Sequence, residues 1–277
     1  MEHLLVRVCD RLGIHLPTCH NSTCRRTGEL WRRRHGESPG ISCEGGWYCG
    51  ADCLESVLNK LLTSTPGLRG PIRGHRIPLG LWLFERGEIS ASQLKLAIEQ
   101  QRARQGARIG ECLREIGAAS ERQITRAIAG QWSCPVFRLD GGPNIPAELV
   151  PYPLLERHRM LPVHAARDRS VLHIAFCQRV DYSALYAIQH MLQRTIQPCI
   201  AGESELLRGL ESARQGRPES EILFEGEHGP REIARIARSY AVQVQAEDAR
   251  VALLPNHAWI ALKRAQKTWN LVFGTAQ

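Results

Sequence analysis

Two stretches of the sequence, PLGLWLFERGEISASQLKLAIEQQ at residues 78–101 and RIGECLREIGAASERQITRAIAGQ at residues 108–131, are copies of one pattern. An offset of 30 residues aligns Gly80 with Gly110 and Gly87 with Gly117. The other identities include Leu83 with Leu113, Ser90 with Ser120, Gln93 with Gln123, Ala97 with Ala127, Ile98 with Ile128 and Gln101 with Gln131. Two copies are too few for a repeat solenoid, so the pattern predicts a pseudo-symmetric pair.

Each copy has the sequence signals of a helix-turn-helix. A short apolar segment ends at Gly87 or Gly117, and a glycine just after a helix can take the left-handed conformation. The next segment starts with Ser-x-x-Gln, at Ser90 and again at Ser120, which is the capping-box pattern of a helix N-terminus. Apolar residues then recur at helical spacing, namely Leu94, Ala97 and Ile98 in the first copy and Ile124, Ala127 and Ile128 in the second. The repeat therefore predicts an all-α pair of helical hairpins.

The repeated pattern resembles the MshEN domain, the N-terminal domain of type II secretion (GspE) and type IV pilus assembly ATPases. Its two tandem motifs have the form Arg-Leu-Gly-x2-Leu-x3-Gly-x6-Leu-x3-Leu-x2-Gln, and the resemblance implies binding of cyclic di-GMP. In the first copy it marks Leu79, Gly80, Leu83, Gly87, Leu94, Ile98 and Gln101 as ligand-binding residues. In the second it marks Arg108, Ile109, Gly110, Leu113, Gly117, Ile124, Ile128 and Gln131.

The implied ligand suits a paired unit, because apolar side chains would meet its guanines while arginine and backbone amides met its phosphates. Packing alone does not account for Gly80 and Gly110, and we expect these glycines to let an anion approach exposed N–H groups. The first copy departs from the motif at Pro78, whereas the second keeps Arg108. Arg76 is the nearest basic residue that could substitute. The alternative is a pair that only docks proteins.

A cluster of cysteines precedes the repeat and predicts a metal site. The spacing is Cys19-x4-Cys24, then Cys43, then Cys49-x3-Cys53. Two close cysteine pairs separated by a loop can bind zinc tetrahedrally, and a short segment with little apolar material needs such a staple. We expect structural Zn²⁺ on Cys19, Cys24, Cys49 and Cys53, with Cys43, His20 and His35 as possible substitutes.

Other interpretations of this N-terminal segment remain open. The run from Gly46 to Cys53 resembles the second knuckle of treble-clef and TRASH-like zinc fingers, and a disulfide or redox site is the competing explanation. Between the cysteine pairs lie an aromatic and several basic residues: Arg25, Arg26, Trp31, Arg32, Arg33, Arg34 and His35. Basic residues around an aromatic on a zinc module can contact nucleic-acid phosphates, although a solvated loop has the same composition.

The rest of the chain alternates between helix and strand patterns. After a linker at Gly141-Gly142-Pro143 we expect helix with turns over 146–159, helices over 181–192 and 203–213, and strands over 160–165, 171–176 and 195–200. This part resembles the second half of the secretion-ATPase N-terminal region. Residues 214–227 are polar and predict a linker. A small α+β cap follows, with a helix over 230–240 and strands over 243–248, 258–265 and 268–273, the last two preceded by a turn at Pro255-Asn256.

Composition and absent motifs limit the function. The formal charge is +8, and the basic residues other than Lys60, Lys95, Lys263 and Lys267 are arginines, which suit phosphate but also arise from a GC-rich genome. No apolar run approaches the length of a membrane span and residues 1–11 lack a signal-peptide pattern, so we expect a cytoplasmic protein without membrane insertion. No Gly-x4-Gly-Lys-Ser/Thr is present. His158, His164 and His173 with Asp168 and Asp181 form at most a weak catalytic candidate, and we do not expect an enzyme.

The sequence thus predicts an α+β multidomain protein. Its expected parts are a zinc module at 1–65, the MshEN-like tandem helical repeat at 66–140, an α/β sandwich-type domain at 141–213, and a linker with the α+β cap at 214–277. The expected function is non-catalytic regulation: cyclic di-GMP binding relayed to a secretion or type IV pilus ATPase or another protein partner. The alternative is a zinc-finger nucleic-acid-binding protein in which the repeats serve as scaffold.

Overall fold

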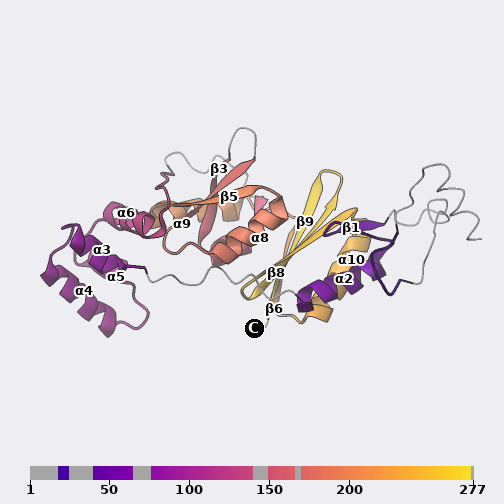
Figure 1. The fold of residues 1–277 in the computed structure, drawn as a ribbon, viewed down its shortest axis with the longest axis horizontal. Coiled ribbons are helices and arrows are strands. Elements are labelled where there is room, and N and C mark those ends of the chain that lie inside the picture. Colours follow the sequence, from indigo (N-terminus) through magenta and orange to yellow (C-terminus); the bar gives the residue numbers. More distant parts are fainter. Residues whose placement is uncertain (1–17, 25–39, 65–75, 140–148, 166–169, 276–277) are drawn as a thin grey trace, which may run out of the picture. The chain divides into compact units, whose positions relative to one another are not determined.

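The computed structural model describes residues 18–24, 40–64, 76–139, 149–165 and 170–275. It divides into two compact units, one of residues 69–217 and one that joins residues 1–68 to residues 218–277 (Figure 1). The sequence-predicted linker at Gly141-Gly142-Pro143 and the basic run from Arg25 to His35 lie outside the described residues. The described helices and strands give a mixed α+β protein with two sheets, as predicted.

The repeat forms two helical hairpins at the start of the unit 69–217. The first copy contains α3 (Leu79–Glu85) and α4 (Ala91–Ala103), and the second contains α5 (Ile109–Glu115) and α6 (Glu121–Trp132). Both predicted capping boxes are present, with Ser90 and Ser120 as the N-caps of the second helices. Gly87 and Gly117 have φ of +68° and +69°, the left-handed conformation that was predicted for them. Local sequence signals therefore determine the hairpins.

The two copies brace each other reciprocally. The side-chain amide of Gln101 donates to the carbonyl of Ala107, 3.1 Å away, just before the second copy begins. The side-chain amide of Gln131 donates to the carbonyl of Ile77, just before the first copy begins. Ile77 and Ala107 are related by the same 30-residue offset as the two glutamines. The pair thus has the pseudo-two-fold arrangement that the duplication predicts.

An α/β part completes this unit. It consists of α7 (Tyr152–Arg157), β3 (Met160–Ala165), β4 (Val171–Phe176), α8 (Tyr182–Leu192), β5 (Thr195–Ile200) and α9 (Glu203–Gln215). The three strands form one sheet in the order β3-β4-β5, where β3 is antiparallel and β5 parallel to β4. The strands have the predicted bounds, and their inner faces are fully buried at Phe176, Ile174 and Ile200.

The other unit is built around a six-stranded sheet in the order β2-β1-β7-β8-β9-β6. Its elements are β1 (Ile41–Cys43), β2 (Gly46–Tyr48), α2 (Ala51–Ser64), β6 (Glu221–Glu227), α10 (Pro230–Gln243), β7 (Asp248–Leu254), β8 (His257–Arg264) and β9 (Lys267–Gly274). Helices α2 and α10 pack together, and Arg238 of α10 forms an ion pair with Asp52 of α2 at 2.7 Å. The predicted turn at Pro255-Asn256 joins β7 to β8.

This unit departs from the sequence prediction at three points. The expected zinc module and the expected C-terminal cap share one sheet, because β1 pairs in parallel with β7 and both contribute to one apolar core. The stretch 214–227, expected to be a linker, contains β6, which pairs with β9. The strand expected over 243–248 is instead the end of α10 and a turn, and β7 begins at Asp248.

Within the described ranges, no helix has both the length and the apolar character needed to cross a bilayer.

Candidate functional site

A pocket of about 290 Å³ lies beside the start of the second copy, entirely within the unit 69–217. Helices α5 and α6 form its floor, Leu79 enters from the first copy, and the turn after β4 with the start of α9 forms its far wall. The lining residues are Leu79, Arg108, Ile109, Gly110, Glu111, Arg114, Glu121, Ile124, Thr125, Ile128, Gln131, Cys177, Gln178, Arg179 and Glu203.

The pocket brings together many, but not all, of the residues that the motif resemblance marked. Those that line it are Leu79, Arg108, Ile109, Gly110, Ile124, Ile128 and Gln131. Leu83 and Leu113 are instead fully buried in the core of the helical pair, and Gly87 and Gly117 form the turns between helices. Gly80, Leu94, Ile98 and Gln101 do not line it either. The second copy therefore supplies most of the candidate site.

Packing explains the two glycines that open the copies, contrary to our expectation. A Cβ at Gly80 would lie 2.6 Å from Cδ1 of Leu94, and a Cβ at Gly110 would lie 3.3 Å from side-chain atoms of Ile124 and Leu79. Both glycines are buried where the helix starts of the two copies approach each other. A side chain at either position would require these neighbouring side chains to shift, so packing accounts for at least part of the preference for glycine.

Arg108 is one of the three arginines that line the pocket. It is the N-cap residue of α5, its backbone N–H donates to Glu111 at 3.3 Å, and its side chain is 45% exposed. Its guanidinium lies 3.3 Å from the carboxylate of Glu111 and 3.6 Å from that of Glu203. A planar guanidinium at this position suits a phosphate oxygen, because it can donate two parallel hydrogen bonds.

The far wall of the pocket comes from residues that no motif predicted. Glu203 begins α9, and its Oε1 also accepts from Gln178 at 2.9 Å and from Arg159 at 3.2 Å. Glu121 of α6 accepts from both the backbone N–H and the hydroxyl of Ser204, which ties the helical pair to α9. The thiol of Cys177 is neutral, since burial raises its pKa to about 11.

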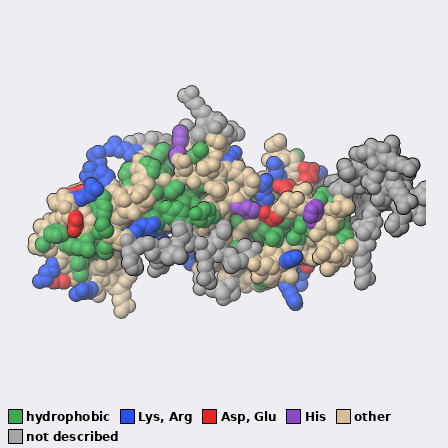
Figure 2. Space-filling view, viewed as in Figure 1, with side chains coloured by type: hydrophobic (Ala, Val, Ile, Leu, Met, Phe, Trp, Pro, Cys, Tyr) green, Lys and Arg blue, Asp and Glu red, His purple; other side chains and the backbone are tan. Residues whose placement is uncertain are grey.

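A second hollow of about 390 Å³ lies on the first copy. Six of its lining residues, Leu81, Phe84, Ala91, Leu94, Lys95 and Ile98, are the 30-residue equivalents of Glu111, Arg114, Glu121, Ile124, Thr125 and Ile128. Figure 2 shows hydrophobic side chains gathered over the helical pair, with basic side chains near them. Arg76 does not replace the missing arginine in this hollow, because its guanidinium stacks on the ring of Trp132 at 3.3 Å.

The predicted cysteine ligands converge in the other unit. The sulfurs of Cys19, Cys24, Cys49 and Cys53 all lie within 4.8 Å of one another. The Sγ of Cys49 is 3.6 Å from that of Cys24 and 3.7 Å from that of Cys53. A zinc ion with bonds of about 2.3 Å to four thiolates separates the sulfurs by about 3.8 Å, so the four residues fit a tetrahedral zinc site.

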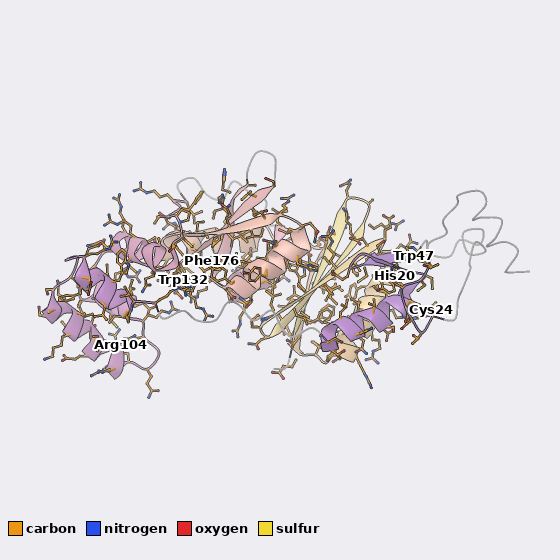
Figure 3. The ribbon with its side chains drawn as sticks, viewed as in Figure 1. His20, Cys24, Trp47, Arg104, Trp132 and Phe176 are labelled. Atoms are coloured by element: carbon orange, nitrogen blue, oxygen red, sulfur yellow. The ribbon has the colours of Figure 1, made fainter. Side chains whose placement is uncertain are left out.

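Backbone pairing holds these cysteines in place. The backbone N–H of His20 donates to the carbonyl of Trp47 at 2.9 Å, and the N–H of Trp47 donates to Nδ1 of His20 at 3.2 Å. These contacts set the segment with Cys19 and Cys24 beside β2, close to the start of α2 (Figure 3). The pKa values of the Cys49 and Cys53 thiols are raised mainly by burial, so metal binding would have to displace their protons.

Among the described residues, neither Cys43 nor His20 belongs to this cluster. Cys43 is fully buried on β1, where it packs into the core, and burial raises the pKa of its thiol to about 12. His20 uses Nδ1 for the hydrogen bond to Trp47, and His35 lies outside the described residues.

The histidines of the α/β part form a hydrogen bond within the fold or lie on paired strands. His158 is hydrogen-bonded to Asp181 at 2.9 Å, and Asp181 also accepts from two backbone N–H groups as the N-cap of α8. Burial acts to raise the pKa of Asp181, but the hydrogen bond with His158 and the other contacts lower it overall. His164 and His173 are cross-strand neighbours on β3 and β4, and Asp168 lies outside the described residues.

Comparisons with known proteins relate this chain to pilus and secretion proteins. PilB, a type IV pilus assembly ATPase of Myxococcus xanthus (strain DK1622), is 29% identical over 136 residues, which are 48% of this chain and 23% of PilB. The chain thus spans about a quarter of the length of this relative.

Solved structures with N-terminal domains of this kind are also similar. A structure of MshE with cdg is 30% identical, with a TM-score of 0.43, and covers 50% of this chain and 99% of that chain. The N-terminal domain of XpsE is 20% identical, with a TM-score of 0.36 and coverages of 48% and 91%. The MshEN domain family matches residues 132–220, which begin directly after the second copy of the motif. The chain therefore carries a region of the MshEN domain family.

Proposed function

We propose that this chain is a non-catalytic regulatory protein that binds cyclic di-GMP in the pocket beside Arg108. The observation that carries the proposal is the convergence of Arg108, Ile109, Ile124 and Ile128 with Leu79 of the other copy around one cavity. The motif resemblance marks each of these residues as ligand-binding. The match to the MshEN domain family over the adjoining residues supports the same assignment.

The chemistry of the pocket suits a cyclic dinucleotide. Leu79, Ile109, Ile124 and Ile128 supply apolar surface against which a guanine can pack. Arg108, Arg114 and Arg179 supply guanidinium groups for the phosphates. Pro78 occupies the position in the first copy that is equivalent to Arg108. Only the second copy therefore supplies its motif arginine, and we expect a one-sided phosphate clamp.

We also propose an adaptor role, in which the bound state is relayed to a pilus or secretion ATPase. The support is the similarity of this chain to part of PilB, a type IV pilus assembly ATPase.

A structural zinc ion would stabilise the other unit. The four cysteines join the segment before β1 to β2 and α2, and α2 in turn packs on α10 of the C-terminal part. Metal bound there would hold the segment with Cys19 and Cys24 against α2, which packs on α10.

Isothermal titration of the full chain with cyclic di-GMP tests the proposed ligand. We expect saturable heat for the wild type and at least about tenfold weaker binding for Arg108→Ala, because charge-assisted hydrogen bonds contribute about 1.5–3 kcal/mol. Arg126→Ala is the matched control, since Arg126 lies on α6 outside the pocket with a 55% exposed side chain. No heat from folded wild type at tens of micromolar protein would overturn the proposal.

A further inference from the structure

Arg108, one of the arginines that line the candidate pocket, is close to two carboxylates. The guanidinium of Arg108 lies close to Glu111 on its own helix and to Glu203 on α9. Of these two, only Glu203 belongs to the α/β part of the unit. Its side chain is 21% exposed, so solvent screens its charge less than that of a fully exposed carboxylate.

One oxygen of Glu203 is shared by three donors from different elements. Oε1 lies 3.6 Å from Nη1 of Arg108, 3.2 Å from Nη1 of Arg159 and 2.9 Å from Nε2 of Gln178. Arg159 and Gln178 remain as partners if Arg108 leaves. The contact between Arg108 and Glu203 is thus the longest of the three and the most easily exchanged.

The charges that line the pocket balance before any ligand arrives. Three arginines, Arg108, Arg114 and Arg179, face three glutamates, Glu111, Glu121 and Glu203. A cyclic dinucleotide brings two negative phosphates into this neutral surrounding. A phosphate at Arg108 would stand beside Glu203, and like charges at such distances repel each other.

We propose that Glu203 is an internal competitor for Arg108 that sets the affinity of the pocket for its anionic ligand. The proposal rests on the proposed cyclic di-GMP function. A phosphate takes the Arg108 guanidinium, and Glu203 is then held by Arg159 and Gln178 alone. The exchange removes the ion pair between Arg108 of the helical pair and Glu203 of α9, whereas Glu121 keeps its hydrogen bonds to Ser204 at the start of α9. Ligand binding is thereby coupled to the α/β part.

Two substitutions with opposite expected signs test this competition. Glu203→Gln removes the negative charge but keeps an oxygen for Arg159 and Gln178, and it should tighten cyclic di-GMP binding about two- to fivefold, as expected for loss of a solvent-accessible ion pair. Arg159→Gln removes a rival donor and leaves Glu203 to Arg108, so it should weaken binding about two- to fivefold. Arg159 does not line the pocket, so a direct ligand contact does not account for its effect.

The experiment is calorimetric titration of the full chain with cyclic di-GMP, with melting temperatures measured on the same samples. Glu211→Gln is the matched control, because Glu211 lies on α9 outside the pocket and should leave the affinity unchanged. Tighter binding by Glu203→Gln with weaker binding by Arg159→Gln supports the inference. Wild-type binding that Glu203→Gln leaves unchanged or weakens overturns the inference alone. Folded proteins that all fail to bind overturn the proposed function as well.

Discussion

Substitutions of the two equivalent glutamines, Gln101 and Gln131, can be compared with each other, so that one variant serves as the control for the other. Gln101 and Gln131 occupy equivalent positions, and each donates to the backbone carbonyl that precedes the other copy. Only Gln131 also lines the candidate pocket. Replacing each with alanine therefore separates the bracing of the pair from contact with the ligand.

The expected losses of stability and of ligand affinity follow from the contacts that each substitution removes. Each substitution removes one hydrogen bond of about 0.5–1.5 kcal/mol, which lowers the melting temperature of a unit of this size by about 1–6 °C. Gln131→Ala should in addition weaken cyclic di-GMP binding about two- to tenfold, whereas Gln101→Ala should change the affinity much less. The stability loss should be similar for the two variants, because the two bonds are equivalent in the pseudo-symmetric pair.

Thermal unfolding followed by circular dichroism and titration calorimetry on the same preparations measures both quantities. Equal losses of affinity in the two variants would show that the glutamines act only as scaffold. Unchanged melting temperatures in both would refute the bracing argument itself. A larger effect of Gln101→Ala on binding would place the ligand on the first copy and contradict the pocket assignment.

Two further predictions concern the cysteine site and the α/β part. The chain purified without chelator should carry about one zinc ion. Cys49→Ser should lose the zinc together with hydrogen-exchange protection in β1 and α2, whereas the control Cys134→Ser, in the unit 69–217, should keep it. Full zinc content in Cys49→Ser would contradict the ligand set. For Asp181, the lowered pKa means that its ionised form contributes stability above the ordinary value of 3.8, and this contribution is lost as the pH falls through the lower folded-state pKa. Asp181→Asn should cost about 1 kcal/mol at pH 7 and flatten the decline of the unfolding free energy below pH 3.8; parallel acid curves would refute the assignment.

Local signals in the sequence were sufficient for the helical pair. The caps at Ser90 and Ser120 and the turns at Gly87 and Gly117 depend on residues within one or two helical turns, so a repeat visible by eye predicts them. The strands β3, β4 and β5 were also predicted, and β3 and β4 are short, mainly apolar runs.

Features that depend on distant pairing were not predicted. Strand β6 has exposed glutamates and was interpreted as a linker, because its hydrogen-bond partner β9 lies more than 40 residues away in the chain. The joining of β1 to β7 spans most of the sequence and carries no local signal. Glu203 was missed for the same reason, since nothing near it in the sequence indicates that Arg108 is its neighbour.

The duplication shows which residues decide what each copy binds. Most positions that the copies share serve the scaffold: Leu83 and Leu113 fill the core, Gly80 and Gly110 permit close packing, and the paired glutamines brace the helix starts. Shared residues such as Ile98 and Ile128 also line the hollows, but the charges that the copies supply there come from positions that differ. Arg108, Glu111 and Arg114 in the second copy correspond to Pro78, Leu81 and Phe84 in the first, where Leu81 and Phe84 are 47% and 42% exposed.

The two hollows therefore share one architecture and differ in charge. The motif residues that form the scaffold predict the fold of both copies equally well, yet they say little about the ligand of either. The anion-binding chemistry rests on the second copy and on the α/β part that faces it. For this reason the decisive measurements are those on Arg108, Gln131 and Glu203, whose side chains line the pocket, and not those on the motif residues buried beneath them.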